Sequence, residues 1–149
     1  GEFNILNAMA ALLAAHEAGV SYETGIELLK SFRSTRRRFE YIGHSPRDGH
    51  RFYDDYAHHP QEIAATISAM RQWEPGHALS LIFQPHPFTR TQALFDETAA
   101  SLSGADEVIL LDIFASARED DAYDISSDDL AVAIGCGLQI GLVAVILRV

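Results

Sequence analysis

The stretch Tyr53-Asp54-Asp55-Tyr56-Ala57-His58-His59-Pro60-Gln61-Glu62 places carboxylate, phenol and imidazole groups between two regular elements. The residues that lead into it, 51–56, are typical of a strand. Pro60 suits the first position of a helix, where its missing N–H leaves no hydrogen bond unmade. Apolar side chains then recur at helical spacing, at Ile63, Ile67 and Met70. The stretch is therefore predicted to be a strand-to-helix turn at the carboxyl end of a strand, where open α/β sheets bind their ligands.

A second polar turn, Gln84-Pro85-His86-Pro87-Phe88, follows the adjacent predicted strand, residues 78–83. In a parallel sheet with right-handed crossovers, the loops after both strands emerge at the same edge. We therefore expect the two turns to face one cleft, since convergent polar groups in a cleft commonly mark a binding site. The alternative is structural, because aspartates before a helix often only cap it and polar clusters on turns often satisfy the backbone.

Strands and helices alternate along most of the chain, which predicts an α/β domain with a doubly wound, mostly parallel, Rossmann-like sheet. Strands are expected at four places, residues 39–44, 51–56, 78–83 and 107–111. Helices are expected in the same part at residues 60–73, 89–102 and 128–134, the last capped by Ser126 or Ser127. Residues 112–124 are expected to be a long loop that is too acidic to pack well.

A helix pair is expected before the sheet, at residues 4–18 and 23–32, with Ser21 as the cap of the second helix. Nothing strand-like precedes this pair. We therefore predict two parts, with residues 1–32 as the helical end of a neighbouring domain and residues 33–149 as the α/β domain.

The composition narrows the class of function. The chain has 149 residues, 48% of them hydrophobic, which suits one compact domain plus a remnant of another. Its formal net charge of −10 argues against broad binding of nucleic acids or anionic membranes. A single cysteine, Cys136, excludes an internal disulfide and fits a reducing cytoplasm. The chain lacks a leader-type segment, and its apolar tail, residues 138–147, is too short to span a bilayer, so a cytoplasmic location without membrane insertion is expected.

Basic residues cluster in this acidic chain, at Arg33, Arg36, Arg37 and Arg38. Such a run is either a solvated linker or a site for phosphate groups, whose geometry the guanidinium group matches.

Four motifs together resemble the Mur ligase family. They are Asn4-x-x-Asn7-Ala8, Arg37-Arg38-Phe39-Glu40, Asp54-Asp55-Tyr56-Ala57-His58-His59-Pro60 and Phe83-Gln84-Pro85-His86-x-Phe88-Thr89-Arg90-Thr91. The last motif resembles the branch that adds L-alanine to UDP-N-acetylmuramate in peptidoglycan synthesis. The motifs occur in the family's order over residues 1 to about 134.

The resemblance implies the carboxyl-terminal domain of a three-domain ligase, preceded by the end of its central ATPase domain. Such enzymes use ATP and Mg²⁺ to convert the substrate carboxylate into an acyl phosphate, which the amino acid then attacks. The resemblance implies nucleotide contacts for Asn4, Asn7, Arg38 and Asp55. It implies a pocket for alanine and the reacting acyl group made by Tyr56, His58, His86 and Arg90, with His58 and His86 as the catalytic residues.

The phosphates of ATP and Mg²⁺ would be held mainly by the central domain. The chain contains no G-x-x-x-x-G-K-[ST] phosphate loop, and alone it is expected to be inactive. It departs from the family pattern at Phe3, where histidine is usual, at Pro87, where arginine is usual, and in its tail, residues 135–149. The arginine expected at position 87 would form half of a carboxylate clamp.

Two other functions remain open from the sequence. A divalent-metal-dependent hydrolase is one, because the turns offer suitable ligand types at Asp54, Asp55, His58, His59 and His86. Nothing in the spacing fixes a metal geometry, however. A non-catalytic nucleotide-binding module is the other, and it would keep the fold without turnover.

Overall fold

A computed structural model of the chain describes residues 2–32, 35–117, 119, 123–135 and 143–147. Cys136 and most of the linking segment before residue 143 therefore lie outside the described residues. The chain divides into two compact units, Gly1–Thr35 and Arg36–Val149, and each unit is described by itself. No helix in the described parts of the chain is long and apolar enough to cross a bilayer.

The first unit is a pair of helices, α1 (Glu2–Glu17) and α2 (Tyr22–Ser31), which confirms the expected helix pair. Ser21 caps α2 as predicted, because its Oγ accepts a hydrogen bond from the backbone N–H of Thr24 at 3.2 Å. The helices approach closely at Gly25, where an added Cβ would lie only 2.6 Å from Cδ2 of Leu12. A side chain at this position would require the Leu12 side chain to move.

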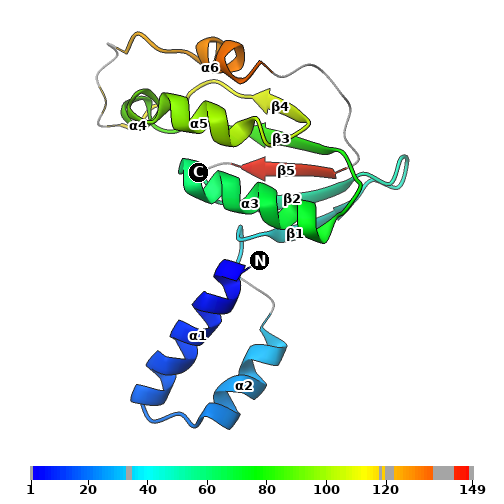
Figure 1. The fold of residues 1–149 in the computed structure, drawn as a ribbon, viewed down its shortest axis with the longest axis vertical. Helices are drawn as coiled ribbons and strands as arrows, with labels where there is room; N and C mark the ends of the chain where they lie inside the picture. The colour runs from blue at the N-terminus through cyan, green and yellow to red at the C-terminus, as the bar shows by residue number, and fades with distance from the viewer. Residues whose placement is uncertain (1, 33–34, 118, 120–122, 136–142, 148–149) are drawn as a thin grey trace. The chain divides into compact units, whose positions relative to one another are not determined.

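The second unit is built on a five-stranded sheet with the order β1-β2-β5-β3-β4 (Figure 1). The strands are β1 (Glu40–His44), β2 (Arg51–Asp55), β3 (Leu79–Phe83), β4 (Glu107–Leu110) and β5 (Val143–Leu147). β1 pairs antiparallel with β2, and the other neighbours are parallel. The predicted α/β class with a mostly parallel sheet is confirmed.

The central strand β5 was not expected from the sequence. It lies between β2 and β3, so the strands that carry the two polar turns are not neighbours in the sheet, and this separation was not predicted. The sequence of β5, Val-Ala-Val-Ile-Leu, has no polar alternation, which is typical of a strand covered on both faces. Such a short apolar run in a glycine-rich tail gives no signal of where it will pair.

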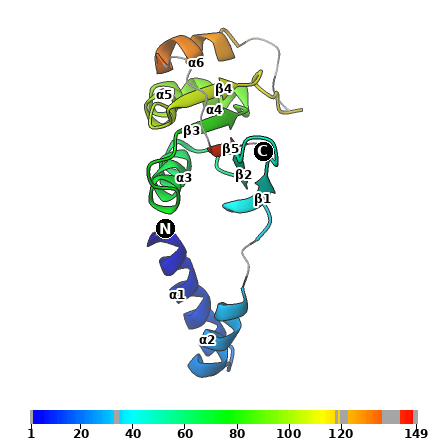
Figure 2. The same ribbon diagram turned by 90° about the vertical axis from the view of Figure 1, so that its right-hand side faces the viewer.

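Four helices connect the strands of the second unit. They are α3 (Pro60–Trp73), α4 (Phe88–Ala93), α5 (Phe95–Leu102) and α6 (Ser127–Ile134). In Figure 2, α3 and α5 lie side by side along one face of the sheet, and α6 packs next to α5. The core between helices and sheet contains fully buried side chains from most of these elements, Ile63, Met70, Leu81, Leu102, Leu130 and Val145.

The single helix predicted for residues 89–102 is wrong, because the chain breaks at Leu94 into α4 and α5. Leu94 has backbone angles of φ −121° and ψ 31°, outside the helical region. Its N–H still bonds to the carbonyl of Arg90 at 2.9 Å, and its own carbonyl accepts from Thr98 at 2.9 Å. The break therefore leaves these backbone groups satisfied, and no proline or glycine marks it in the sequence.

A buried polar network joins β2 to the end of α3. The Tyr53 hydroxyl donates to Oε1 of Glu74 at 2.7 Å, and Nη2 of Arg51 lies 3.0 Å from the other carboxylate oxygen. Burial, together with the hydrogen bond to Glu74, raises the pKa of Tyr53 to about 12. This network satisfies polar groups that would otherwise destabilise the core.

Candidate functional site

The two polar turns lie at the same edge of the sheet, one strand apart. Asp55 at the end of β2 is in register with Leu147 of β5, which is in register with Phe83 at the end of β3. Neighbouring strands are about 4.8 Å apart, so the strand ends that carry the turns are separated by roughly 10 Å. Both turns therefore carry their side chains at the same edge of the sheet, on either side of β5.

Asp55 holds the first turn together. Its Oδ2 accepts the N–H of Phe39 at 2.7 Å, and its Oδ1 accepts the N–H of Ala57 at 2.8 Å. Burial raises the pKa of Asp55, although the hydrogen bonds from Ala57 and Phe39 act in the opposite direction. Asp54 is as deeply buried, since both residues are 6% exposed, and its Oδ2 lies 3.6 Å from Nε of Arg37. Both aspartates therefore have a structural role, whatever else Asp55 contacts.

The arginine pair lies over the ring of Tyr56. The guanidinium of Arg37 is 4.8 Å from the ring centroid and that of Arg38 is 5.6 Å away, within the range of a cation–π interaction. Tyr56 also donates its backbone N–H to the carbonyl of Arg37 at 2.8 Å. The basic segment is thus tied to the first polar turn at these positions, and Arg33 lies outside the described residues.

The backbone of this basic segment is strained. Arg37 and Phe39 have φ angles of 58° and 53°, in the left-handed region that side chains disfavour by roughly 1–2 kcal/mol. The conformation aims the N–H of Phe39 at the Asp55 carboxylate. A hydrogen bond to a charged acceptor contributes about 1.5–3 kcal/mol, enough to offset the strain at that residue.

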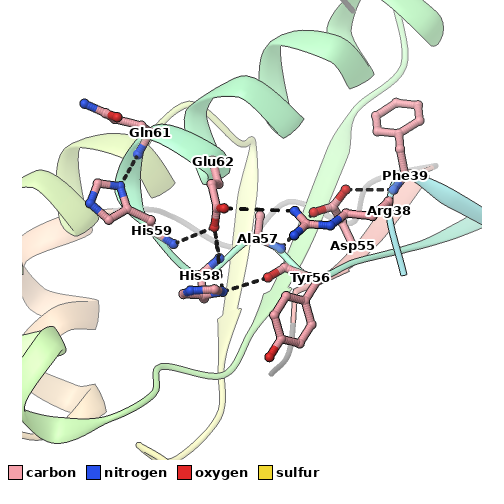
Figure 3. A network of polar contacts seen from close by, with 9 residues as sticks. All are labelled: Arg38, Phe39, Asp55, Tyr56, Ala57, His58, His59, Gln61 and Glu62. Carbon is pink, nitrogen blue, oxygen red and sulfur yellow. Dashed lines mark hydrogen bonds and ion pairs between the residues drawn. The ribbon is translucent and has the colours of Figure 1, made fainter. Parts of the chain in front are cut away.

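Glu62 organises the histidines of the first turn (Figure 3). Its Oε2 accepts the backbone N–H of His58 at 3.1 Å and that of His59 at 3.2 Å, while Oε1 lies 4.0 Å from Nη1 of Arg38. Partial burial opposes ionisation of Glu62, but these two backbone hydrogen bonds prevail and lower its pKa. An anionic Glu62 therefore fixes both the turn and the nearby guanidinium.

His58 and His59 have different roles. His58 Nδ1 lies 3.0 Å from the carbonyl of Tyr56, and because a carbonyl only accepts, Nδ1 must carry the proton. Neutral His58 then has Nε2 as an acceptor. His59 is the N-cap of α3, since its Nδ1 accepts the N–H of Gln61 at 3.3 Å and Glu62 completes a capping box. His59 therefore has a structural role, which the sequence analysis kept as an alternative for this turn. The cap of α3 is this histidine and not one of the aspartates, however.

The second turn carries His86 and Arg90. His86 Nδ1 lies 2.8 Å from the carbonyl of Phe114, and the two rings are 5.4 Å apart. Nη1 of Arg90 donates to the carbonyl of His86 at 3.0 Å, so this guanidinium is held against its own turn. Pro87 stands at the N-cap of α4 and provides no side-chain hydrogen bond to the helix.

Glu119 was missed by the sequence analysis. Its carboxylate accepts from the N–H of Phe88 at 3.1 Å, the N–H and hydroxyl of Thr89 at 2.8 and 2.6 Å, and the N–H of Ser116 at 3.0 Å. None of the described residues of 112–124 is buried, in line with the prediction that this loop packs poorly, but Glu119 attaches it to the start of α4. Nothing distinguishes Glu119 from its acidic neighbours in the sequence, whereas Glu62 does stand at the capping-box spacing after His59.

The structure thus groups Arg38, Asp55, Tyr56 and His58 in one turn and places His86 and Arg90 in the other. Asn4 and Asn7 lie one turn apart on α1 of the first unit, and both are exposed. Their nucleotide contacts stay a prediction.

Among the described residues, no group of three or more His, Cys, Asp or Glu side chains is arranged to hold a metal ion. The metal-dependent hydrolase is therefore not supported.

Comparison with known proteins adds to this geometry. A family profile described as "Mur ligase, glutamate ligase domain" matches residues 37–146. A UDP-N-acetylmuramate–L-alanine ligase of Desulfitobacterium hafniense is 45% identical over 131 residues, which cover 88% of this chain and 29% of that protein. The protein of the same name from Clostridium acetobutylicum is 46% identical over 134 residues, covering 90% of this chain and 28% of that protein. The chain thus spans less than a third of the length of these relatives.

Solved structures share the fold. The crystal structure of a UDP-N-acetylmuramate–alanine ligase from Thermotoga maritima matches with a TM-score of 0.73 at 24% identity, covering 99% of this chain and 34% of that one. A murein peptide ligase from Psychrobacter arcticus matches with a TM-score of 0.63 at 23% identity, with the same coverage of both chains.

Proposed function

Because the chain belongs to the Mur ligase family, we propose that it is the carboxyl-terminal part of an ATP-dependent ligase that joins L-alanine to UDP-N-acetylmuramate in peptidoglycan synthesis. In this proposal residues 1–32 are the end of the central ATPase domain and residues 33–149 are the carboxyl-terminal domain. The observation that carries it is the placement of both polar turns at one edge of the sheet, in register across β5. The names of the 45–46% identical relatives support the choice of alanine.

The first turn fits a nucleotide in part. The Arg38 side chain is 52% exposed, and its guanidinium geometry suits phosphate oxygens. Asp55 is less open, but each of its carboxylate oxygens accepts one backbone N–H and has a second lone pair for a ribose hydroxyl. We assign Arg38 and Asp55 to the nucleotide, and we keep the family-based assignment of Asn4 and Asn7 to nucleotide contacts.

The amino acid would lie between the turns. We assign Arg90 to its carboxylate, since position 87 carries proline and offers no charge. Tyr56 would line the pocket. In their neutral forms, His58 and His86 each hold Nδ1–H on a backbone carbonyl and present Nε2 as an acceptor for the amino group that must lose a proton before it attacks.

ATP would supply activation of the substrate carboxylate when bound. No Mg²⁺ ligands are assigned to this chain, because its described residues contain no suitable cluster and its sequence lacks a phosphate loop. We assign the metal, the phosphates and the UDP-sugar to the domains that make up the rest of the relatives' length. The chain alone is then inactive, and we expect the whole enzyme to act in the cytoplasm.

The proposal is tested with the longer protein that contains this domain, by measuring phosphate release that depends on both L-alanine and UDP-N-acetylmuramate. Arg90→Ala should raise the KM for alanine about tenfold to a hundredfold, because a charge-assisted hydrogen bond contributes about 1.5–3 kcal/mol. The KM for ATP should stay within about twofold.

Arg47→Ala is the matched control, since Arg47 is an exposed arginine in the turn between β1 and β2. It should leave both constants unchanged. A wild-type enzyme without alanine-dependent phosphate release would refute the proposed function. An unchanged KM for alanine in Arg90→Ala would instead remove Arg90 from the amino-acid pocket.

A further inference from the structure

The segment after β4 folds back onto the second polar turn. We call residues 111–119 the strap, of which residue 118 lies outside the described part. The N–H of Leu111 donates to the carbonyl of Phe83 at 2.9 Å, and the N–H of Phe114 donates to the carbonyl of Pro85 at 2.9 Å. The strap therefore continues the pairing of β3 and β4 beyond the end of the sheet.

Glu119 fastens the far end of the strap. Its carboxylate receives hydrogen bonds from the backbone of Phe88 and from both the backbone and hydroxyl of Thr89, which begin α4. It also receives the N–H of Ser116, within the strap itself. Partial burial opposes ionisation, but the hydrogen bonds from Thr89, Ser116 and Phe88 lower the pKa of Glu119 to about 2, so the group is anionic near neutral pH.

Between these two attachments the strap touches His86. The carbonyl of Phe114 lies 2.8 Å from Nδ1 of His86, and the Phe114 ring lies against the imidazole. Because a carbonyl can only accept, this contact requires the proton on Nδ1. That is the minor tautomer of a free neutral imidazole side chain, so the strap selects it.

We propose that Glu119 is a positioning residue that keeps the strap docked and thereby fixes His86 as the Nδ1–H tautomer, with Nε2 directed to the substrate as an acceptor. The role of Nε2 toward the amino group of alanine rests on the proposed function. The link from Glu119 through Phe114 to His86 does not depend on the proposed function. Glu119 touches no reacting atom in this proposal and acts only through the strap.

The test is long-range ¹H–¹⁵N NMR of the histidine rings in the whole chain, at a pH where the imidazoles are neutral. Wild type should show His86 with Nδ1 protonated and Nε2 bare. Glu119→Ala removes both carboxylate oxygens that accept hydrogen bonds from Phe88 and Thr89, and Glu119→Gln leaves one acceptor oxygen of the two. Both should move His86 toward the Nε2–H tautomer, with the larger shift in the alanine variant.

His58 is the internal control. It has the same tautomer on the carbonyl of Tyr56, in the other turn, and should keep it in both variants. Glu97→Ala is the matched control, because Glu97 is an exposed glutamate in the first turn of α5, and it should leave His86 unchanged. If the alanine variant alters His58 as well, it has unfolded and the glutamine variant decides. An unchanged His86 tautomer in a Glu119 variant that retains the wild-type His58 signals would overturn the proposal.

The kinetic consequence separates this inference from the proposed function. In the longer protein, Glu119→Gln should raise the KM for alanine severalfold without changing that for ATP, and Glu97→Gln should change neither. If the wild-type enzyme does not use alanine while the His86 shift is observed, the proposed function fails and the coupling stands. If alanine is used but His86 does not respond, the coupling fails and the proposed function stands.

Discussion

Among the described residues of the second unit, three carboxylates each bind the backbone N–H groups of at least two residues. Asp55 ties residues 39 and 57, Glu62 ties residues 58 and 59, and Glu119 ties residues 88, 89 and 116. A charged acceptor that binds several backbone donors orders a turn more firmly than an exposed ion pair does. Glu62 and Glu119 thereby hold side chains that are assigned to substrate without being assigned a contact themselves, whereas Asp55 both orders its turn and is assigned to the nucleotide.

The hydrogen bond from the Tyr53 hydroxyl to the carboxylate of Glu74 leads to a testable prediction. The pKa of Tyr53 is raised from 10.0 to about 12, so the folded state holds this proton more tightly than the unfolded state. Its contribution to stability is therefore complete below about pH 10 and is lost as the pH rises through about 12. The free energy of unfolding, measured by urea titration from pH 9 to 11.5, should fall with pH more steeply in wild type than in Tyr53→Phe.

Tyr22→Phe is the control for this measurement, because Tyr22 is a partly exposed tyrosine of the first unit. It should retain the wild-type decline. Equal slopes in wild type and Tyr53→Phe would mean that the buried hydroxyl is not linked to folding.

At the scale of single elements, the helix ends show which boundaries the sequence predicts and which it does not. From residue type alone, the sequence predicted Ser21 as one helix cap and either Ser126 or Ser127 as another. The structure confirms Ser21 and Ser126 as the caps. Pro60 correctly marked the start of α3, because its geometry acts locally. The break at Leu94 was not predictable, since a leucine there is equally suited to a continuous helix and only packing in the folded domain separates α4 from α5.

The cap of α3 can be tested separately from the chemistry of the turn. His59→Ala should lower the free energy of unfolding by about 0.5–2 kcal/mol, because it removes the acceptor for the N–H of Gln61, whereas His59→Asn should retain most of the stability. Urea unfolding at neutral pH measures both. His44→Ala, at an exposed histidine of β1, should have little effect. A loss in His59→Asn as large as that in His59→Ala would show that His59 does more than cap the helix.

The sheet order is set at the scale of the whole molecule. The sequence predicted the strands that precede residue 112, because each is bounded by turn or loop residues and two of them are followed directly by a helical pattern. It did not predict β5, whose pairing depends on contacts with residues about 60 and 90 positions earlier in the chain. The shared edge of the two polar turns was therefore correctly predicted, but their separation by one strand was not.

Val145 provides the test of this arrangement. It is 1% exposed and pairs with Tyr53 on one side and Leu81 on the other, so Val145→Asp would bury an unpaired charge in the centre of the sheet. We expect loss of cooperative thermal unfolding of the second unit, followed by circular dichroism. Val132→Asp is the matched control, because Val132 is 83% exposed on α6 and should tolerate the same change. A cooperative transition near the wild-type temperature in Val145→Asp would show that β5 is not the central strand.

The position of β5 also affects how the chain is made. A ribosome delivers β2 and β3 well before residues 143–147, at roughly 5–20 residues per second. Until those residues emerge, β2 and β3 each present a row of unpaired backbone groups, and such rows are templates for pairing with other chains. The nascent domain therefore passes through several seconds in which its sheet is split at the middle. Translation rate and chaperone supply, rather than the equilibrium stability of the finished fold, should then set the yield of correctly assembled protein in the cell.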